Sequence, residues 1–326
     1  MTMETKMTTI ERVAVVGSGY MGGGIAQVLA LSGASVVLCD ADAETAARSV
    51  ARLVRQAERF EADGLFAVGA AETIRERLSC ADSIETAVAD AEYVTEAVPE
   101  THAIKSEVLA RISAAAPAAA IIASNTSAIP IHQLSASVSG PDRFLGVHWM
   151  NPAPFVPAVE LIPTATTDAS AVERVEAFIR AAGKVPARVS DSPGFVANRL
   201  QFALFKEAVS MVEEGLVTPE QVDTVVSNAF GFRLALFGPF AIADMAGLDV
   251  YNASYASLEA EYGARLAAPR SLVQHVDDGR LGVKSGGGFL DIDPLQTAEL
   301  LAYRDRAYAA LSKLRAELGQ APGLSS

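Results

Sequence analysis

The residues best suited to acid–base chemistry lie in the middle of this 326-residue chain. His148, one of only four histidines, follows an apolar run that predicts a β-strand over Phe144–Val147. Histidine is the side chain whose unperturbed pKa suits proton exchange near neutral pH. Glu160 lies within another apolar run, where a carboxylate needs a partner, and His148 is the natural candidate. The two residues predict either a base with an orienting acid, as hydride transfer from an alcohol requires, or a buried pair that only holds the fold.

A glycine-rich run near the N-terminus predicts a dinucleotide site. It consists of Gly17, Ser18, Gly19, Tyr20, Met21 and Gly22. The run follows a predicted strand, Arg12–Val16, and precedes an apolar helix that ends at Gly33. The first glycine of such a turn permits the tight bend, the second lets the backbone approach a pyrophosphate, and the third lets the helix pack on the strand. The free amides at the start of the helix would then face the phosphates.

An acidic residue indicates which dinucleotide is bound. Asp40 follows the next predicted strand, Ser35–Cys39. A carboxylate at this place accepts hydrogen bonds from the adenosine ribose hydroxyls and repels a 2′-phosphate. The predicted cofactor is therefore NAD(H) rather than NADP(H). The histidines have no Cys or His neighbours at ligand spacing, so no metal site is expected.

The elements around these residues predict the fold class. In the first half, short β-branched runs alternate with helical patterns, which is typical of a parallel sheet wrapped by helices. Further strands are predicted at Tyr93–Ala97, Ala120–Ala123 and Phe144–Val147, and helices at Glu44–Ala62 and Ile104–Ala115. The prediction is an α/β protein with an N-terminal Rossmann doubly wound sheet over residues 10–190, after a disordered tail over residues 1–9.

From about residue 190 onward the sequence predicts helices only. Ser192 and Pro193 suit the N-cap and first position of a helix that Gly215 ends. Residues 218–221 predict a capping box that opens the next helix, and Asp293-Pro294 opens the last one. We expect residues 191–326 to form an all-helical domain for substrate binding and dimerisation. Its apolar helices are too many for a monomer to cover easily, so a homodimer is expected.

Composition excludes several classes of protein. The chain has 26 Lys+Arg and 39 Asp+Glu, which gives a net charge of −13 and a pI near 4.8. General attraction to nucleic acid or anionic lipid is therefore not expected. No apolar run approaches the roughly 20 residues of a membrane helix, and the two cysteines, Cys39 and Cys80, fit a reducing compartment. We expect a cytoplasmic protein whose partner is a small-molecule substrate.

Five motifs in register resemble the 3-hydroxyacyl-CoA dehydrogenase family. They are the glycine-rich run extended to Gln27, Asn125-Thr126-Ser127, His148-x-x-Asn151-Pro152, Val159-Glu160, and Ser192-Pro193-Gly194-Phe195 followed by Asn198-Arg199. Their order and spacing match from residue 12 to about residue 290. The resemblance implies a doubly wound N-terminal domain, a helical C-terminal domain that makes a homodimer, and L stereochemistry at the reacting carbon.

The resemblance also implies roles for single residues. His148 would be the catalytic base, Glu160 would orient it, and Ser127 and Asn198 would hold the substrate oxygen. It adds Glu100, Lys105 and Asn151 to the residues expected to contact the cofactor. That set is Gly17, Gly19, Tyr20, Met21, Gly22, Asp40, Glu100, Lys105, Ser127 and Asn151.

At some positions this chain has other residues than the acyl-CoA enzymes usually have. Trp149-Met150 stands where two Phe are usual after the base, and Pro157 lies before Glu160 where a Lys is common. These features resemble the branch of L-gulonate, carnitine and pyridine-carboxylate dehydrogenases. An NAD-dependent 3-hydroxyacyl-CoA dehydrogenase is the first expectation, and a dehydrogenase of a free hydroxy acid or polar alcohol is the alternative. A protein that binds NAD(H) without turnover is the hypothesis from another class.

A basic stripe bears on the choice between these substrates. Arg48, Arg52, Arg55 and Arg59 recur at three- and four-residue spacing on one face of a predicted helix. Such a stripe is either a solvated helix face or a docking face for the phosphates of CoA.

Overall fold

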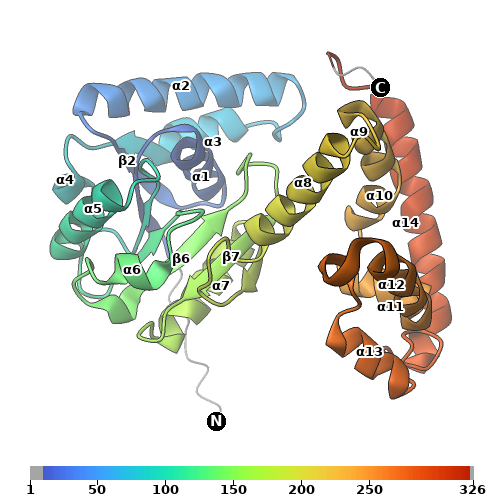
Figure 1. The fold of residues 1–326 in the computed structure, drawn as a ribbon. Helices are drawn as coiled ribbons and strands as arrows, with labels where there is room; N and C mark the ends of the chain where they lie inside the picture. The colour runs from blue at the N-terminus through green and yellow to red at the C-terminus, as the bar shows by residue number, and fades with distance from the viewer. Residues whose placement is uncertain (1–9, 324–326) are drawn as a thin grey trace, which may run out of the picture. The chain divides into compact units, whose positions relative to one another are not determined.

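The computed structural model describes residues 10–323, so the tail predicted over residues 1–9 lies outside the described residues. Internal contacts divide the chain after Ala203 into two units. The first unit is a sheet covered by helices, and the second consists of helices (Figure 1). The predicted α/β class with a helical C-terminal part is confirmed. Within the described residues no helix has both the length and the apolar character needed to cross a membrane.

An eight-stranded sheet forms the centre of the first unit, in the order β3-β2-β1-β4-β5-β6-β7-β8. The strands are β1 (Arg12–Val16), β2 (Ser35–Cys39), β3 (Leu78–Cys80), β4 (Tyr93–Glu96), β5 (Ile121–Ser124), β6 (Phe144–Trp149), β7 (Ala158–Pro163) and β8 (Val185–Arg188). Strands β1 to β6 run parallel, and the chain order reverses at β1, as in a doubly wound fold. Their carboxyl ends share one edge of the sheet, where such folds bind ligands.

Strands β3, β7 and β8 were not among the predicted strands. β3 has only three residues, β7 has Glu160 at its centre, and β8 contains Pro186. The sequence predicts a parallel sheet, but β7 pairs antiparallel with β6, and β8 runs parallel to β7. The sheet is therefore mixed. Proline is tolerated in β8 because it is an edge strand. Burial and pairing, rather than local propensity, place these strands.

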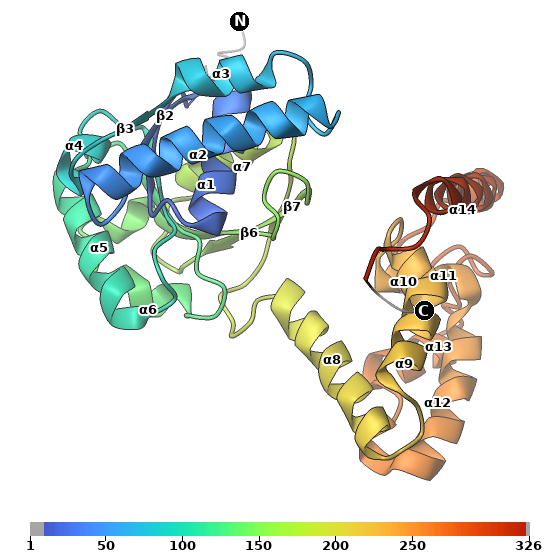
Figure 2. The ribbon, with the colours of Figure 1, turned by 90° about the horizontal axis from the view of Figure 1, so that it is seen from above.

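Helices cover both faces of the sheet. One face carries α1 (Tyr20–Leu31), α2 (Ala43–Ala62), α3 (Ala70–Arg77) and α7 (Ala169–Ala181); the other carries α4 (Ile84–Val88), α5 (His102–Ala115) and α6 (Ile131–Ser135). Figures 1 and 2 show α1 and α2 together on one side of the strands and α4, α5 and α6 on the other. The two predicted helices and the predicted strands agree with these bounds to within two residues.

The two core clusters follow the alternation of side chains along each strand. Val13 and Val15 of β1 are buried beneath α1, whereas Ala14 and Val16 pack on the opposite side with α4 and α5. Successive side chains of a strand point to opposite faces, so a strand buried on both faces is apolar at every position. This is why the N-terminal strands could be predicted from sequence.

The helix predicted to begin at Ser192-Pro193 begins instead at Ala197, and this α8 ends at Glu213. The backbone φ angle is +76° at Gly194 and +48° at Phe195. A right-handed helix cannot run through these left-handed residues. The Ser-Pro signal is therefore wrong as a helix start, and the residues before α8 form a turn closed by a hydrogen bond from the Phe195 amide to the Ser192 carbonyl.

The second unit continues α8 with α9 (Pro219–Asn228), α10 (Phe230–Leu234), α11 (Pro239–Ala246), α12 (Leu248–Tyr262), α13 (Arg270–Asp277) and α14 (Thr297–Leu318). Thr218 and Gln221 form the predicted capping box at α9, each side chain accepting from the other's backbone amide. Pro294 opens a short 3₁₀ turn directly before α14, so the predicted last helix is confirmed.

The second unit has a small core of its own. Its buried apolar cluster consists of Ala243, Leu248 and Leu272. The carboxylate of Asp244 is also buried and accepts hydrogen bonds from the amides of Phe289 and Leu290 at 3.1 and 2.8 Å. This pairing fixes the preceding glycine-rich residues as a tight turn.

Two glycines of the first loop provide a stability test. A Cβ atom at Gly22 would lie 1.8 Å from the carbonyl oxygen of Gly17, whereas a Cβ at Gly19 would meet nothing within 4 Å. We expect Gly22→Ala to lower the free energy of unfolding by about 2–3 kcal/mol, because backbone must move to admit the methyl group. Gly19→Ala is expected to change it by less than about 0.5 kcal/mol. Urea unfolding followed by circular dichroism measures both; equal losses would contradict the close approach at Gly22.

Candidate active site

His148 and Glu160 lie directly opposite each other on neighbouring strands. The antiparallel register of β6 and β7 pairs the two residues. The Nδ1 atom of His148 lies 2.8 Å from Oε2 of Glu160, and the side chains are only 5% and 7% exposed. Cross-strand neighbours share one face of a sheet, so the pair follows from the register.

The second oxygen of Glu160 accepts two backbone hydrogen bonds. The amides of Val196 and Ala197 donate to Oε1 at 3.0 and 2.9 Å. Ala197 begins α8, so the carboxylate lies at the positive end of a helix dipole. Burial acts to raise the pKa of Glu160, but the hydrogen bonds from His148, Ala197 and Val196 outweigh it and lower the pKa below the usual value. The carboxylate is therefore ionised at neutral pH.

Phe195 forms the turn that supplies these amides. Its backbone is left-handed, its side chain is buried, and its ring centroid lies 5.5 Å from that of His148. Sequence reasoning missed the contribution of Phe195, Val196 and Ala197. The available signal was the glycine before Phe195, which favours a left-handed turn over the start of a helix.

The ionised carboxylate fixes the orientation of the histidine ring. A carboxylate only accepts hydrogen bonds, so the Nδ1 atom of His148 is the donor to Glu160. Nε2 lies 3.1 Å from the hydroxyl oxygen of Ser127. The ring is thereby oriented with Nε2 toward Ser127.

Ser127 belongs to a polar run that starts at the carboxyl end of β5. The hydroxyl of Ser124 donates to Oε2 of Glu96 at 2.5 Å. The side-chain oxygen of Asn125 accepts from the amide of Trp149 at 2.9 Å. These two bonds connect β5 to β4 on one side and β6 on the other. The loop that carries Ser127 is therefore anchored to both neighbouring strands.

Glu100 holds the remainder of this loop. Its Oε1 atom accepts from the hydroxyl of Thr126 and from the amides of Ser127 and Ala128, the latter two at 2.9 and 3.0 Å. Its Oε2 atom lies 3.4 Å from Nζ of Lys105. Burial acts to raise the pKa of Glu100, and these hydrogen bonds with the nearby lysine lower it below its usual value. Glu100 thus positions Ser127.

The structure brings together the four residues for which the resemblance implies a catalytic role. The amide Nδ2 of Asn198, in the first turn of α8, donates to the carbonyl oxygen of Ser127 at 2.9 Å. His148 contacts Ser127 through Nε2 and Glu160 through Nδ1. The arrangement is a histidine between an acidic partner and a serine hydroxyl, with an asparagine bonded to the backbone of that serine.

Lys105 and Asn151 occupy different environments. Lys105 is buried, and its Nζ donates to Oε1 of Glu96 at 2.8 Å and to the carbonyl oxygen of Val98 at 3.1 Å. Asn151 is exposed and follows the carboxyl end of β6. Nζ of Lys105 lies 3.4 Å from Oε2 of Glu100, whereas Asn151 is exposed.

The glycine-rich loop fits a dinucleotide through its backbone. Gly17 has a φ of +102°, and a Cβ there would lie 2.6 Å from the carbonyl oxygen of Ala97. Gly19 is the N-cap of α1 without a side-chain cap, and a Cβ there would enter open space. The first amides of α1 are thus available to a pyrophosphate. Tyr20 is 64% exposed beside this space, and Met21 is half-buried against the core.

Asp40 lies beside the same loop at the end of β2. The amides of Ser18 and Ala41 each donate to its carboxylate at 2.7 Å, and the Ser18 hydroxyl donates as well. Burial acts to raise the pKa of Asp40, but these hydrogen bonds lower it below its usual value. Arg52 donates to the carbonyl oxygen of Ser18 at 2.9 Å. An ionised carboxylate therefore lies beside the glycine-rich loop, at the carboxyl end of β2.

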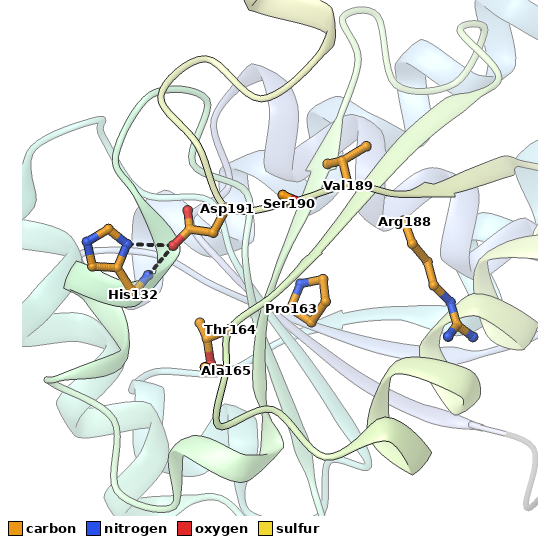
Figure 3. A pocket seen from close by; sticks show the side chains of 8 residues that line it. All are labelled: His132, Pro163, Thr164, Ala165, Arg188, Val189, Ser190 and Asp191. Atoms are coloured by element: carbon orange, nitrogen blue, oxygen red, sulfur yellow. Dashed lines mark hydrogen bonds and ion pairs between the residues drawn. The ribbon is translucent and has the colours of Figure 1, made fainter. Parts of the chain in front are cut away.

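A cavity of about 510 Å³ lies elsewhere on the first unit (Figure 3). It is lined by His132, Pro163, Thr164, Ala165, Arg188, Val189, Ser190 and Asp191. Asp191 accepts from the amides of Ile131 and His132 and lies 2.6 Å from Nδ1 of His132. No predicted site residue lines this cavity. Within residues 10–323 no group of three or more metal-binding side chains is found.

Comparisons with known proteins find relatives along most of the chain. Residues 12–192 match the NAD binding domain of 3-hydroxyacyl-CoA dehydrogenase, and residues 194–292 match its C-terminal domain. The 5-formyl-3-hydroxy-2-methylpyridine 4-carboxylate 5-dehydrogenase of Mesorhizobium japonicum is 36% identical over 94% of this chain and 98% of its own. A probable 3-hydroxybutyryl-CoA dehydrogenase of Bacillus subtilis is 34% identical over 87% of this chain and 98% of its own.

A solved structure agrees with these matches. The 3-hydroxyacyl-CoA dehydrogenase of Archaeoglobus fulgidus is 32% identical and superposes with a TM-score of 0.77, covering 95% of this chain and 99% of its own. The predicted family and NAD cofactor are confirmed. The chain belongs to the 3-hydroxyacyl-CoA dehydrogenase family and is an NAD-dependent oxidoreductase that acts on CH–OH groups.

Proposed function

We propose that His148 is the base in the oxidation of a 3-hydroxyacyl substrate to its 3-oxo form. The supporting observation is that the imidazole contacts Glu160 on one side and Ser127 on the other. Its Nδ1 lies 2.8 Å from Oε2 of Glu160, and its Nε2 lies 3.1 Å from Oγ of Ser127. Bound NAD⁺ supplies the hydride acceptor. The Nε2 atom of His148 takes the hydroxyl proton, and ionised Glu160 stabilises the imidazolium that forms. In the reverse direction the imidazolium donates the proton.

Ser127 and Asn198 are proposed to hold the reacting oxygen. The Ser127 hydroxyl lies 3.1 Å from Nε2 of His148, and the Asn198 amide donates to the backbone carbonyl oxygen of Ser127. The reacting oxygen changes its charge as the proton leaves, and fixed donors stabilise such a change without reorganisation. The hydrogen bond between the two residues supports their acting on the same atom.

The first candidate substrate is a 3-hydroxyacyl-CoA of the 3-hydroxybutyryl type. The relative in Bacillus subtilis is named for this substrate. Arg48, Arg52, Arg55 and Arg59 are exposed along α2. A protein with a net charge of −13 needs such a local cationic face to bind the phosphates of CoA.

The second candidate is a free hydroxy acid or polar alcohol. The match that favours it is the Mesorhizobium japonicum enzyme, which is named for a pyridine carboxylate and aligns with 94% of this chain. A small carboxylate needs one cation or a few backbone amides rather than a basic helix face.

Assays of NADH formation distinguish the candidates. 3-Hydroxybutyryl-CoA, free 3-hydroxybutyrate, L-carnitine, L-gulonate and a pyridine alcohol carboxylate are compared at equal concentrations. A kcat/KM at least about 100-fold higher for the thioester supports the first candidate, since that ratio is worth roughly 2.7 kcal/mol of transition-state binding. The opposite ratio supports the second candidate. Absence of NADH formation with all five would contradict the proposed chemistry.

Removal of the base or its partner tests the dyad. We expect His148→Gln to lower kcat by roughly 10²–10⁴-fold, the usual contribution of a general base, with little change in NADH binding. Glu160→Gln is expected to slow turnover as well, because the imidazolium loses its counter-charge. His132→Gln, a change at an exposed histidine outside the site, is the matched control and keeps the kcat of the unmodified protein. Near-normal turnover in either dyad variant would show the assignment to be wrong.

Asp40 provides a test of cofactor choice. We expect NAD⁺ to be preferred over NADP⁺ because the carboxylate accepts from the ribose hydroxyls and repels a 2′-phosphate. Asp40→Ser is expected to reduce this preference at least about tenfold, or roughly 1.4 kcal/mol, while exposed Asp63→Ser leaves it unchanged. Steady-state kcat/KM values for both cofactors measure the effect. A protein that prefers NADP⁺ before any substitution would refute the role of Asp40.

We propose that the chain forms a homodimer through its C-terminal helices. The support is the contrast between the small core of the second unit and the apolar side chains that stay exposed on α8 to α11, which include Leu204, Phe205, Val225, Leu234 and Phe240. Apolar surface of this kind is typical of an interface between subunits. Light scattering is expected to give twice the chain mass of 34.0 kDa. A value of one chain mass at micromolar concentration would contradict the proposal.

A further inference from the structure

Lys184 is a buried lysine that the proposed reaction does not use. It precedes β8, and only 8% of its surface is exposed. Burial lowers the pKa of its ammonium group. Among residues 10–323 no carboxylate pairs with this ammonium. Its partners are the backbone carbonyl oxygens of Ala153, Pro154 and Val156, at 2.6, 3.1 and 3.0 Å from Nζ.

The three carbonyls match the ammonium in number. A lysine ammonium has three protons, and each has one acceptor here. Hydrogen bonds from charged donors are stronger than neutral ones, which offsets the cost of burying the charge. Rings of carbonyl oxygens are also how proteins bind K⁺. The carbonyl oxygens of Ala153, Pro154 and Val156 therefore surround a cation, and that cation is the ammonium group of Lys184.

The segment of residues 153–156 packs on one part of the proposed cofactor site, α1, and follows another, Asn151, in the chain. Pro154 and Ala153 pack on Gly24 of α1, where an added Cβ would lie 3.1 and 3.3 Å from their side chains. The same helix begins at the glycine-rich loop. Asn151 lies two residues before Ala153 in the chain. A shift of the segment would therefore move Asn151 relative to α1.

We propose that Lys184 is a positioning residue: a tethered monovalent cation that holds residues 153–156 against α1 and so places Asn151 for the dinucleotide. The inference rests on the proposed cofactor contact of Asn151. It predicts that the positive charge, rather than the length of the side chain, is what the segment needs. A free ammonium ion should then replace the side chain when it is cut back.

The test compares NADH binding in two salts. In sodium chloride we expect Lys184→Ala to raise the Kd for NADH roughly tenfold, because Asn151 is then misplaced for its contact with the dinucleotide. Ammonium chloride at the same ionic strength is expected to return it to within about threefold of the unmodified protein. Lys184→Met fills the space with an apolar chain and is expected to stay weak in both salts. Lys313→Met, at an exposed lysine of α14, controls for the loss of one positive charge. Fluorescence titration with NADH gives each Kd.

Asn151→Ala distinguishes this inference from the function on which it rests. If Asn151→Ala weakens NADH binding but neither Lys184 variant does, the role of Lys184 is overturned alone. If Asn151→Ala binds NADH normally, the contact of Asn151 is overturned and the inference with it. A Lys184→Ala protein that does not respond to ammonium overturns the tethered cation. A Lys184→Ala protein that is unfolded in both salts also overturns the tethered cation, because bound ammonium is expected to restore the fold of residues 153–156.

Discussion

The antiparallel register of β6 and β7 is the constraint on which the candidate site depends. A slip of one residue would turn Glu160 to the opposite face from His148. Once the carboxylate is buried and ionised, its oxygens need partners. The imidazole supplies one, and the amides of Val196 and Ala197 supply two. This need accounts for the left-handed backbone of Phe195, since strained conformations persist where the surrounding contacts over-determine them.

The loop that carries Ser127 is held by two further acids. Glu96 is fully buried and accepts from Lys105, from the hydroxyl of Ser124 and from the amide of Val98. Glu100 accepts from three groups of the loop itself. Each carboxylate accepts hydrogen bonds from fixed donors of the protein, so the polar groups around His148 are positioned before any ligand binds. Preorganisation of this kind reduces the reorganisation that charge movement would otherwise require.

Much of this arrangement could be predicted from the sequence, and the exceptions share a cause. The N-terminal strands are apolar at every position because both faces are buried, and the glycine spacing reports a close backbone approach at Gly22. The pairing of His148 with Glu160 follows from the cost of an unpartnered carboxylate. The reversed strand β7 and the turn at Phe195 could not be predicted, because pairing across the sheet and the demand of Glu160 for donors override local propensity. The contacts of Lys184 could not be predicted from the sequence, because its partners are backbone carbonyl oxygens, which every residue has.

A double-mutant cycle on kcat tests most directly the claim that His148 and Glu160 act as one unit. The cycle compares His148→Gln, Glu160→Gln and the double variant with the unmodified protein, using the best substrate and saturating NAD⁺. If Glu160 acts only through the imidazole, its replacement has nothing left to impair once the ring is gone. The account predicts that the double variant is no slower than His148→Gln alone, within about threefold, or roughly 0.7 kcal/mol. Multiplication of the two single effects would contradict it.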